Sequence, residues 1–319
     1  MARQTTLETV DEFCAVFEAV VDNVSRVVLG KRDAISLALV CLASEGHLLV
    51  EDVPGVGKTT LAKALAHSFD LSWQRIQFTP DLLPSDVTGV TIYDQTSRNF
   101  TFRPGPVFSN VLLGDEINRA SPKTQSALLE AMEERQVTVD GATYPLPAPF
   151  LVIATQNPVE HEGTYPLPES QLDRFLLRVR IGYPDRRAEL AMLDAEPGLG
   201  SVAELPVVAG SEAIATLIQL AARVHVAAPL KEYIIDVAAE TRRHPALDLG
   251  MSPRAALGLL RAARALAASR GREFVIPDDI KALFVPVLAH RLVLSPEAGR
   301  GEQRAEEVVA DIVRSVPVP

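Results

Sequence analysis

A strand, a glycine-rich turn and a helix follow one another at residues 48–69, and this succession constrains the fold more than any other feature. Residues 48–50 (Leu-Leu-Val) are typical of a buried strand, residues 54–57 (Pro-Gly-Val-Gly) predict a turn, and residues 58–69 have the apolar spacing of a helix. The backbone N–H groups of such a turn converge above a helix N-terminus, which suits a polyphosphate. We therefore predict a nucleotide site here.

The residue types of this turn suggest their tasks. Lys58 is expected to reach the β- and γ-phosphates of ATP, and the Thr59 hydroxyl is expected to hold Mg²⁺. We expect the Lys58 ammonium to be exposed until it meets phosphate. The common pattern opens with glycine where this chain has Asp52, and the alternative is a chance glycine-rich turn. The strand and helix around the turn favour nucleotide binding, for which the candidate residues are Pro54, Gly55, Val56, Gly57, Lys58, Thr59 and Thr60.

A second strand ends in two acids. Residues 111–116 (Val-Leu-Leu-Gly-Asp-Glu) are strongly apolar before they end in charge, and charge is costly there unless the site uses it. Asp115 would hold the Mg²⁺ shell beside Thr59, and Glu116 would accept a proton from the attacking water or orient it. Alone, the pair is equally typical of a strand end that reaches solvent. The upstream Gly-Lys-Thr favours the catalytic reading.

Strands and helices alternate through the first part of the chain. Further strands are expected at residues 73–78, at 149–155 and at the end of 172–181, and hairpins at 90–102 and around Asp140-Gly141. The resulting five or so strands predict an α/β fold with a parallel sheet, helices on both of its faces, and the nucleotide at the carboxyl ends of the strands. Thr5 and Glu8 are expected to form a capping box for the first helix.

Strand signals nearly vanish after residues 183–185 (Tyr-Pro-Asp), and helical patterns follow to the C-terminus. We therefore expect two domains: a nucleotide-binding core at 1–184 and an all-helical domain at 185–319. Arg254 lies in the first turn of one of these helices, where a cation opposes the helix dipole. This placement suggests an anionic partner, although a surface arginine is at least as typical of the position.

Two other places remain open from local sequence. Asn157 follows the strand at 149–155, where its amide would touch a γ-phosphate or the attacking water, or would only form a turn. Val28 and Gly30 lie between two N-terminal helices, and they form either an apolar wall for a nucleotide base or an interhelix turn.

Composition and charge exclude several classes of protein. The 319 residues carry a net charge of −10, which disfavours nonspecific binding to nucleic acid or anionic membrane. Cys14 and Cys41 are too few and too isolated for a disulfide framework, which favours a reducing compartment. The first residues lack a signal-peptide pattern, and the apolar run at 37–43 is too short to span a membrane. We expect a soluble, cytoplasmic protein.

Several stretches together resemble the MoxR family of AAA+ ATPases. The resemblance covers nearly the whole chain, and its motifs are specific in combination; they are residues 51–59 (EDVPGVGKT), 115–120 (DEINRA), 125–134 (QSALLEAMEE), 154–158 (ATQNP), 162–169 (EGTYPLPE), 172–175 (LDRF) and 252–255 (SPRA). The presence of Asp52 where the common phosphate-loop pattern has its first glycine also resembles this family. The resemblance implies an AAA+ core with a five-stranded parallel sheet and a hairpin insert in its second core helix. An all-helical lid domain follows.

The resemblance also implies roles for single residues. Asn157 resembles the sensor-1 residue, Arg174 the arginine finger that reaches a neighbouring subunit's site, and Arg254 the sensor-2 arginine of the lid. Val28 and Gly30 resemble part of the adenine pocket. Asn118 and Arg119 lie within a motif, yet no role follows for them.

At the level of the whole protein, the resemblance implies ATP and Mg²⁺ as ligands and a homo-oligomeric ring, commonly a hexamer. Members are thought to act as chaperone-like remodellers or maturation factors for protein substrates, often with partners that carry von Willebrand factor A domains. Three alternatives stay open: a magnesium-chelatase-like motor, a nucleic-acid motor, and a nucleotide-gated scaffold that barely turns over. The acidic charge argues against nucleic acid, and Glu116 with Asn157 argues against the scaffold.

Overall fold

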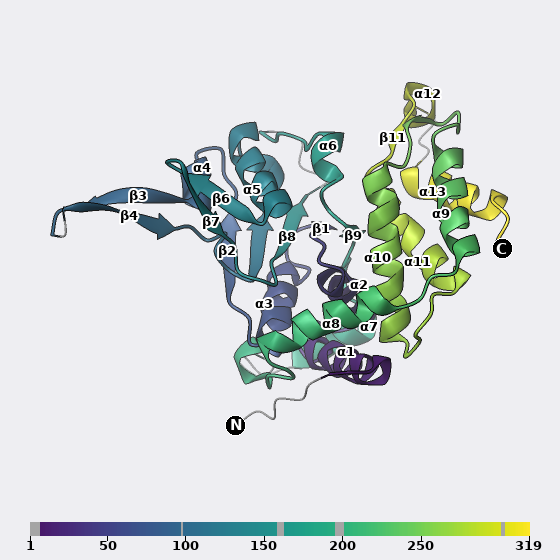
Figure 1. The fold of residues 1–319 in the computed structure, drawn as a ribbon, viewed down its shortest axis with the longest axis horizontal. Helices are drawn as coiled ribbons and strands as arrows, with labels where there is room; N and C mark the ends of the chain where they lie inside the picture. Colours follow the sequence, from purple (N-terminus) through teal and green to yellow (C-terminus); the bar gives the residue numbers. More distant parts are fainter. Residues whose placement is uncertain (1–6, 97, 158–162, 195–200, 301–303) are drawn as a thin grey trace.

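The structure is a computed structural model of the chain that describes residues 7–96, 98–157, 163–194, 201–300 and 304–319. An α/β part with a long hairpin is followed by a group of helices (Figure 1). The first part contains α1 (Val10–Ser25), α2 (Arg32–Ala43), β1 (Leu48–Glu51), α3 (Lys58–Ser68), β2 (Trp73–Gln77), α4 (Pro84–Thr88), β3 (Gly89–Asp94), β4 (Asn99–Pro104), β5 (Val111–Asp115), η1 (Ile117–Arg119), α5 (Pro122–Glu134), β6 (Gln136–Val139), β7 (Ala142–Pro145), β8 (Leu151–Gln156), α6 (Glu169–Leu172) and β9 (Leu177–Val179). The second contains α7 (Arg186–Asp194), η2 (Val202–Glu204), α8 (Ser211–Arg223), α9 (Ala228–Thr241), β10 (Leu247–Leu249), α10 (Pro253–Ser269), α11 (Pro277–Leu288), β11 (Val293–Leu294), α12 (Pro296–Arg300) and α13 (Ala305–Ser315).

Five parallel strands form the central sheet in the order β2-β5-β8-β1-β9. This arrangement confirms the predicted fold class. Because all strands run in one direction, their carboxyl ends share one edge of the sheet and their amino ends share the other. We call these the carboxyl edge and the amino edge.

Both faces of the sheet are covered, because successive side chains of each strand point to opposite faces. Leu48 and Val50 belong to one apolar cluster with buried side chains of α1, α2 and α3, whereas Leu49 belongs to a second cluster with those of α4 and α5. The first cluster continues into α8, α9, α10, α11 and α13 without a break at residue 184. The two-domain division proposed from the sequence therefore has no corresponding gap in the packing, and it stays a proposal.

Two hairpins interrupt the core. β3 and β4 pair from Gly89↔Pro104 to Asp94↔Asn99 and project away from the sheet directly after α4 (Figure 1). This is the predicted hairpin insert. The second hairpin joins β6 and β7 through Asp140 and Gly141, both with positive φ, as the predicted two-residue turn requires.

Details at the ends of elements differ from expectation. α1 begins at Val10, where Thr9 and Glu12 form the capping box, and Thr5 of the predicted box lies outside the described residues. The short antiparallel pair β10–β11 was also not predicted, because strands of three and two residues carry no periodic signal. Within the described ranges, no helix is long and apolar enough to cross a membrane.

Candidate active site

The glycine turn joins β1 to α3 at the carboxyl edge. Gly55 and Gly57 have φ of +87° and +94°, in the left-handed region that favours glycine. A Cβ at either position would meet no neighbouring atom, so backbone conformation rather than space requires glycine here. The turn delivers its N–H groups to the N-terminus of α3, which begins at Lys58. The local geometry therefore suits an anion, as the sequence predicts.

Lys58 lies differently from expectation. Its side chain is buried, with the residue only 9% exposed, and its Nζ donates a 3.0 Å hydrogen bond to the backbone carbonyl of Asp52. The expected exposure of this ammonium was wrong because that carbonyl lies within reach at the start of the turn. The Lys58 ammonium is thus bound to the backbone of the same turn whose N–H groups would bind phosphate.

The Asp52 carboxylate ties the start of the turn to the end of the sheet. Its Oδ2 accepts hydrogen bonds from the backbone N–H groups of Ile181 and Gly182 at 2.6 and 2.7 Å, and its Oδ1 accepts one from Val53 at 3.2 Å. Glycine at this position would remove all three. The departure from the common phosphate-loop pattern therefore has a structural reason.

Asp115 and Glu116 lie beside the turn, where β5 ends. Thr155 of β8 aligns both: its hydroxyl donates to Asp115 Oδ1 at 2.6 Å and accepts from the Glu116 N–H at 2.9 Å. Glu116 has φ +57° and ψ +49°, a left-handed conformation that costs a non-glycine residue free energy. Strain of this kind gathers at functional sites, so it strengthens the case for Glu116.

Two residues of β2 complete this site, and the sequence reasoning missed them. Arg75 forms an ion pair with Asp115 Oδ2 at 2.6 Å, and Gln77 Nε2 donates to Glu116 Oε2 at 2.9 Å. Arg119 lies 3.4 Å from the same Glu116 oxygen. The i, i+2 spacing of Arg75 and Gln77 indicates only that both side chains lie on one face of a strand. Their contacts with Asp115 and Glu116 depend on the pairing of β2 with β5, which cannot be read from the sequence.

One cavity gathers these groups. Its lining comprises Pro54, Gly55, Gly57, Lys58, Thr59, Thr60, Arg75, Gln77, Asp115 and Glu116. The Thr59 hydroxyl and the Asp115 carboxylate are hard oxygen donors in this lining, the ligand type that Mg²⁺ prefers. The residues present therefore fit a Mg²⁺ nucleotide, although Arg75 competes for one Asp115 oxygen.

Other predicted residues lie outside this lining. Among the described residues, Val56 packs against the apolar cluster, and Asn157 is buried at the end of β8. Val28 is also buried. Gly30, with φ +69°, lies against α7, where a Cβ would come within 3.2 Å of the Ala188 Cβ. The roles of these four residues stay predictions.

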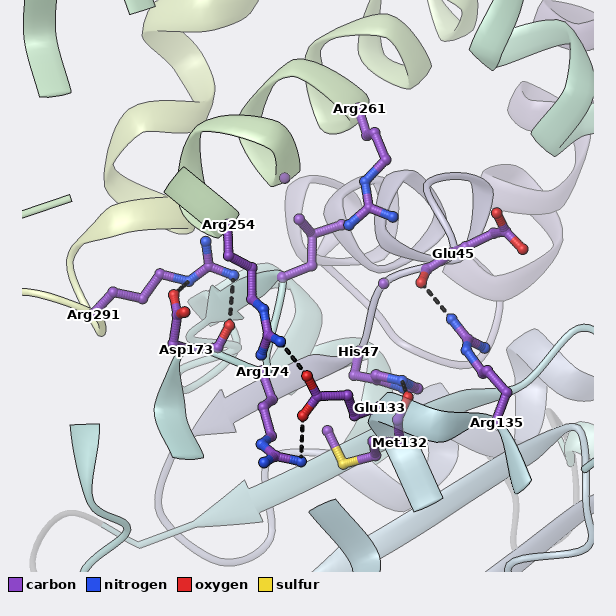
Figure 2. A pocket seen from close by; sticks show the side chains of 13 residues that line it. Glu45, His47, Met132, Glu133, Arg135, Asp173, Arg174, Arg254, Arg261 and Arg291 are labelled. Carbon is purple, nitrogen blue, oxygen red and sulfur yellow. Dashed lines mark hydrogen bonds and ion pairs between the residues drawn. The ribbon is translucent and has the colours of Figure 1, made fainter. Parts of the chain in front are cut away.

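Arg174 and Arg254 lie together in a second cavity, which we call the arginine pocket. Arg174 Nη1 lies 2.6 Å from the Leu129 carbonyl oxygen and 2.7 Å from Glu133 Oε2, and Arg254 pairs with Glu133 Oε1 (Figure 2). Glu133 is thus an anionic partner of Arg254 within the chain, and the functional roles of Arg174 and Arg254 stay predictions. The pocket is lined by Glu45, Gly46, His47, Met132, Glu133, Arg135, Asp173, Arg174, Leu176, Arg254, Gly258, Arg261 and Arg291.

The arginine pocket lies at the amino edge, opposite the glycine turn. Leu176 N–H donates to the carbonyl of His47, which directly precedes β1, and Arg135 donates to the carbonyl of Phe150, which directly precedes β8. The strands β1 and β8 are four and six residues long, so the two edges lie roughly 13–20 Å apart. Arg174 and Arg254 therefore do not share the cavity of Lys58.

The arginine pocket has an excess of positive charge. Burial lowers the pKa of Arg291 to about 10, with Asp173 opposing the shift and Arg254 adding to it. Burial, and then the nearby Arg135, lower the pKa of His47 to about 3, so this imidazole is neutral at pH 7. Five arginines thus face three carboxylates, which leaves a surface suited to an anionic partner.

Comparison with known proteins defines the class. Residues 47–177 match the model of the ATPase family associated with various cellular activities (AAA), and residues 239–312 match the AAA lid domain. The parallel sheet, the glycine turn and the Asp115-Glu116 pair fit this assignment. The chain is an AAA ATPase: it binds a nucleotide and hydrolyses ATP.

Full-length relatives define the family more closely. The chain is 51% identical to the uncharacterised protein YeaC of Bacillus subtilis over 94% of its own length and 93% of that protein. It is 42% identical to the chaperone MoxR1 of Mycobacterium tuberculosis over 95% of this chain and 82% of that protein. A solved structure of a candidate ATPase from Cytophaga hutchinsonii superposes with a TM-score of 0.91 at 39% identity, covering 97% of both chains. The chain belongs to the MoxR family of AAA ATPases.

Proposed function

We propose that this MoxR-family ATPase works in a homo-oligomeric ring, a hexamer. In this ring, one subunit binds each ATP, and its neighbour supplies the residues that complete the catalytic site. The observation that carries this proposal is the separation of the two halves of the site. The phosphate-binding turn lies at the carboxyl edge, and Arg174 with Arg254 lies at the amino edge. Neither arginine lines the nucleotide cavity of its own chain, which supports a role for both in the site of another subunit.

Within one subunit, the carboxyl edge supplies binding and water activation. The turn N–H groups and Lys58 hold the phosphates, with the Lys58 ammonium exchanging the Asp52 carbonyl for phosphate oxygen. Thr59 and Asp115 hold Mg²⁺, which neutralises phosphate charge when bound. Glu116 takes a proton from the attacking water, and Gln77 and Thr155 fix its position. Asn157 is proposed to orient the water or the γ-phosphate.

The neighbouring subunit supplies Arg174 and Arg254. Charge develops on the transferring phosphoryl group, and guanidinium groups directed at it stabilise the transition state. Arg254 lies on α10, so the helical region moves with the phosphate that it contacts. Hydrolysis in one subunit would then shift the helices of the next.

We propose that the ring uses this motion as a chaperone-like remodeller or maturation factor for protein partners. The printed name of the Mycobacterium tuberculosis relative, a chaperone, supports this class. The resemblance to the family supports a partner with a von Willebrand factor A domain. The net charge of −10 argues against nucleic acid, and Cys14 and Cys41, both free thiols, support a cytoplasmic location.

ATP hydrolysis measured against protein concentration, with assembly followed by sedimentation velocity, tests the shared site. The specific activity of the wild-type protein should rise as subunits assemble, because a monomer has no neighbour to donate Arg174. Arg174→Ala should bind ATP with wild-type affinity and lose roughly 10³- to 10⁵-fold in hydrolysis rate. Arg223→Ala, at an exposed arginine of α8, is the matched control and should behave as wild type. A monomer that hydrolyses ATP at the assembled rate would overturn the proposal.

A further inference from the structure

A single carboxylate contacts two of the five arginines of the arginine pocket, Arg174 and Arg254. Glu133, near the end of α5, places Oε2 2.7 Å from Arg174 Nη1 and Oε1 against Arg254 Nη2 (Figure 2). Arg174 comes from the segment before β9, and Arg254 comes from the first turn of α10. Glu133 therefore joins two guanidinium groups that lie 80 residues apart in the chain.

Without this carboxylate the two guanidinium groups would separate. They are like charges on long side chains, 29% and 46% exposed. Repulsion at short range and the rotamer freedom of arginine would both favour separation. Leu129, which accepts from Arg174 Nη1 at 2.6 Å, restrains only one of them.

The backbones that carry the two arginines are held together by other contacts. The Ser252 hydroxyl, at the N-cap of α10, donates to Asp173 Oδ1 at 3.0 Å and so joins the two segments directly. Arg291, which follows α11, also holds the Arg174 segment, because its Nη2 donates to the Phe175 carbonyl at 2.8 Å. These contacts fix where the two side chains begin. Among the residues that the structure describes, Glu133 is the group that contacts the guanidinium ends of both.

Glu133 leaves each arginine able to bind more. In the part of the chain that the structure describes, Arg174 Nη2 and Arg254 Nη1 make no hydrogen bond. Each guanidinium thus keeps N–H donors for an incoming anion while one of its nitrogens stays on the carboxylate. This is the geometry of a support rather than of a competitor that must leave first.

We propose that Glu133 is a positioning residue that sets Arg174 and Arg254 as one unit toward the γ-phosphate bound by the neighbouring subunit. The inference rests on the proposed function, in which those arginines act across the interface. Glu133 itself touches neither nucleotide nor water. It acts by holding the donors in place before the phosphate arrives, which lowers the reorganisation required in the transition state.

Glu133→Gln tests the inference, because the amide keeps the shape of the side chain and removes its charge. At protein concentrations where the ring is assembled, we expect unchanged ATP affinity and a hydrolysis rate roughly 10- to 100-fold lower, the size of a small misplacement of a catalytic group. Glu134→Gln, the adjacent exposed acid on α5, is the matched control and should keep the wild-type rate. Thermal unfolding of both variants should match wild type, because exposed ion pairs contribute little to stability.

A double-variant comparison separates positioning from a general structural effect. In an Arg174→Ala, Arg254→Ala background, Glu133→Gln should cause no further loss, since nothing remains for it to position. Single-turnover assays with excess protein resolve the slow residual hydrolysis. A multiplied loss in that background, a wild-type rate for Glu133→Gln, or a faster rate would each overturn the inference about Glu133 and leave the proposed function intact. Wild-type hydrolysis by the double-arginine variant would instead overturn the proposed function.

Discussion

At the scale of single residues, the site depends on ion pairs that no local pattern announces. Asp115 and Glu116 end a buried strand, and each is engaged by a β2 side chain, Arg75 and Gln77 respectively. Thr155 then fixes the backbone of Glu116 and one oxygen of Asp115. This acidic pair, which we propose to be catalytic, is therefore held in place by side chains of the two neighbouring strands.

Glu116→Gln should keep MgATP binding and lose hydrolysis. The amide preserves the size of the side chain but cannot take a proton from water. Calorimetric affinity for ATP should match wild type, while phosphate release should fall to background. The variant should also favour an ATP-loaded assembly that sedimentation can detect. Hydrolysis at the wild-type rate would remove Glu116 from the mechanism.

Arg75→Ala should lower the Mg²⁺ concentration that is needed for half-maximal ATP binding. Arg75 occupies the Asp115 Oδ2 atom at 2.6 Å and so competes with the metal shell for that carboxylate. Because Arg75 is about half exposed, its ion pair is weak, and we expect this Mg²⁺ concentration to fall by roughly 2- to 5-fold in the variant. Titration of Mg²⁺ with a fluorescent ATP analogue measures it, with Arg103→Ala as the control from the exposed hairpin. A higher Mg²⁺ concentration at half-maximal binding would show that Arg75 supports the metal site instead.

At the scale of elements, most of the core was predictable from sequence, and the missing parts have physical reasons. β1, β5 and β8 are continuous apolar runs, and Asp140-Gly141 has the residues that its turn requires, so each carries a local signal. The sharing of Glu133 by two arginines carries none, because it depends on α5, the segment before β9 and α10 meeting in space. The task of Arg75 likewise follows from strand order.

The contact between α5 and the start of β8 predicts a pH dependence of stability. His47 lies there, with Nε2 on the Met132 carbonyl and Nδ1 accepting from the Val152 N–H, and its pKa is lowered to about 3 by burial and then by Arg135. In the unfolded chain the pKa of this histidine is near 6.5, so between pH 6.5 and pH 3 the imidazole is protonated in the unfolded chain and neutral in the folded one. Stability from this group is complete above pH 6.5 and falls by about 1.4 kcal/mol per pH unit below it, toward pH 3.

His47→Gln tests this dependence, because glutamine can donate to Met132 and accept from Val152 without titrating. Urea unfolding at pH 7.5 and pH 5.5 should show a loss of stability that is smaller in the variant by about 1.4 kcal/mol. The carboxylates titrate in both proteins and cancel in the comparison. Equal losses in the two proteins would show that His47 is protonated without unfolding.

At the scale of the whole molecule, the proposed function assigns complementary halves of one reaction to the two edges of the sheet. A mixture of Lys58→Ala and Arg174→Ala subunits should therefore regain hydrolysis that neither has alone. Lys58→Ala keeps intact arginines, and Arg174→Ala keeps an intact phosphate turn, so some interfaces in a mixed ring are complete. Phosphate release from titrated mixtures should peak at intermediate ratios. A mixture that includes Lys58→Ala, Arg174→Ala double-variant subunits in place of one partner is the control and should show no peak.

The placement of these halves also restricts symmetry. A two-fold dimer uses the same surface patch on both subunits, so it would complete a site only if the turn and the arginines lay within one patch. The turn and the arginines lie at opposite edges of the sheet, which favours a head-to-tail contact, and repetition of such a contact either closes into a ring or continues as a helical filament. A small change in the angle between subunits would then convert a closed, finite machine into an open polymer, with every internal site still complete.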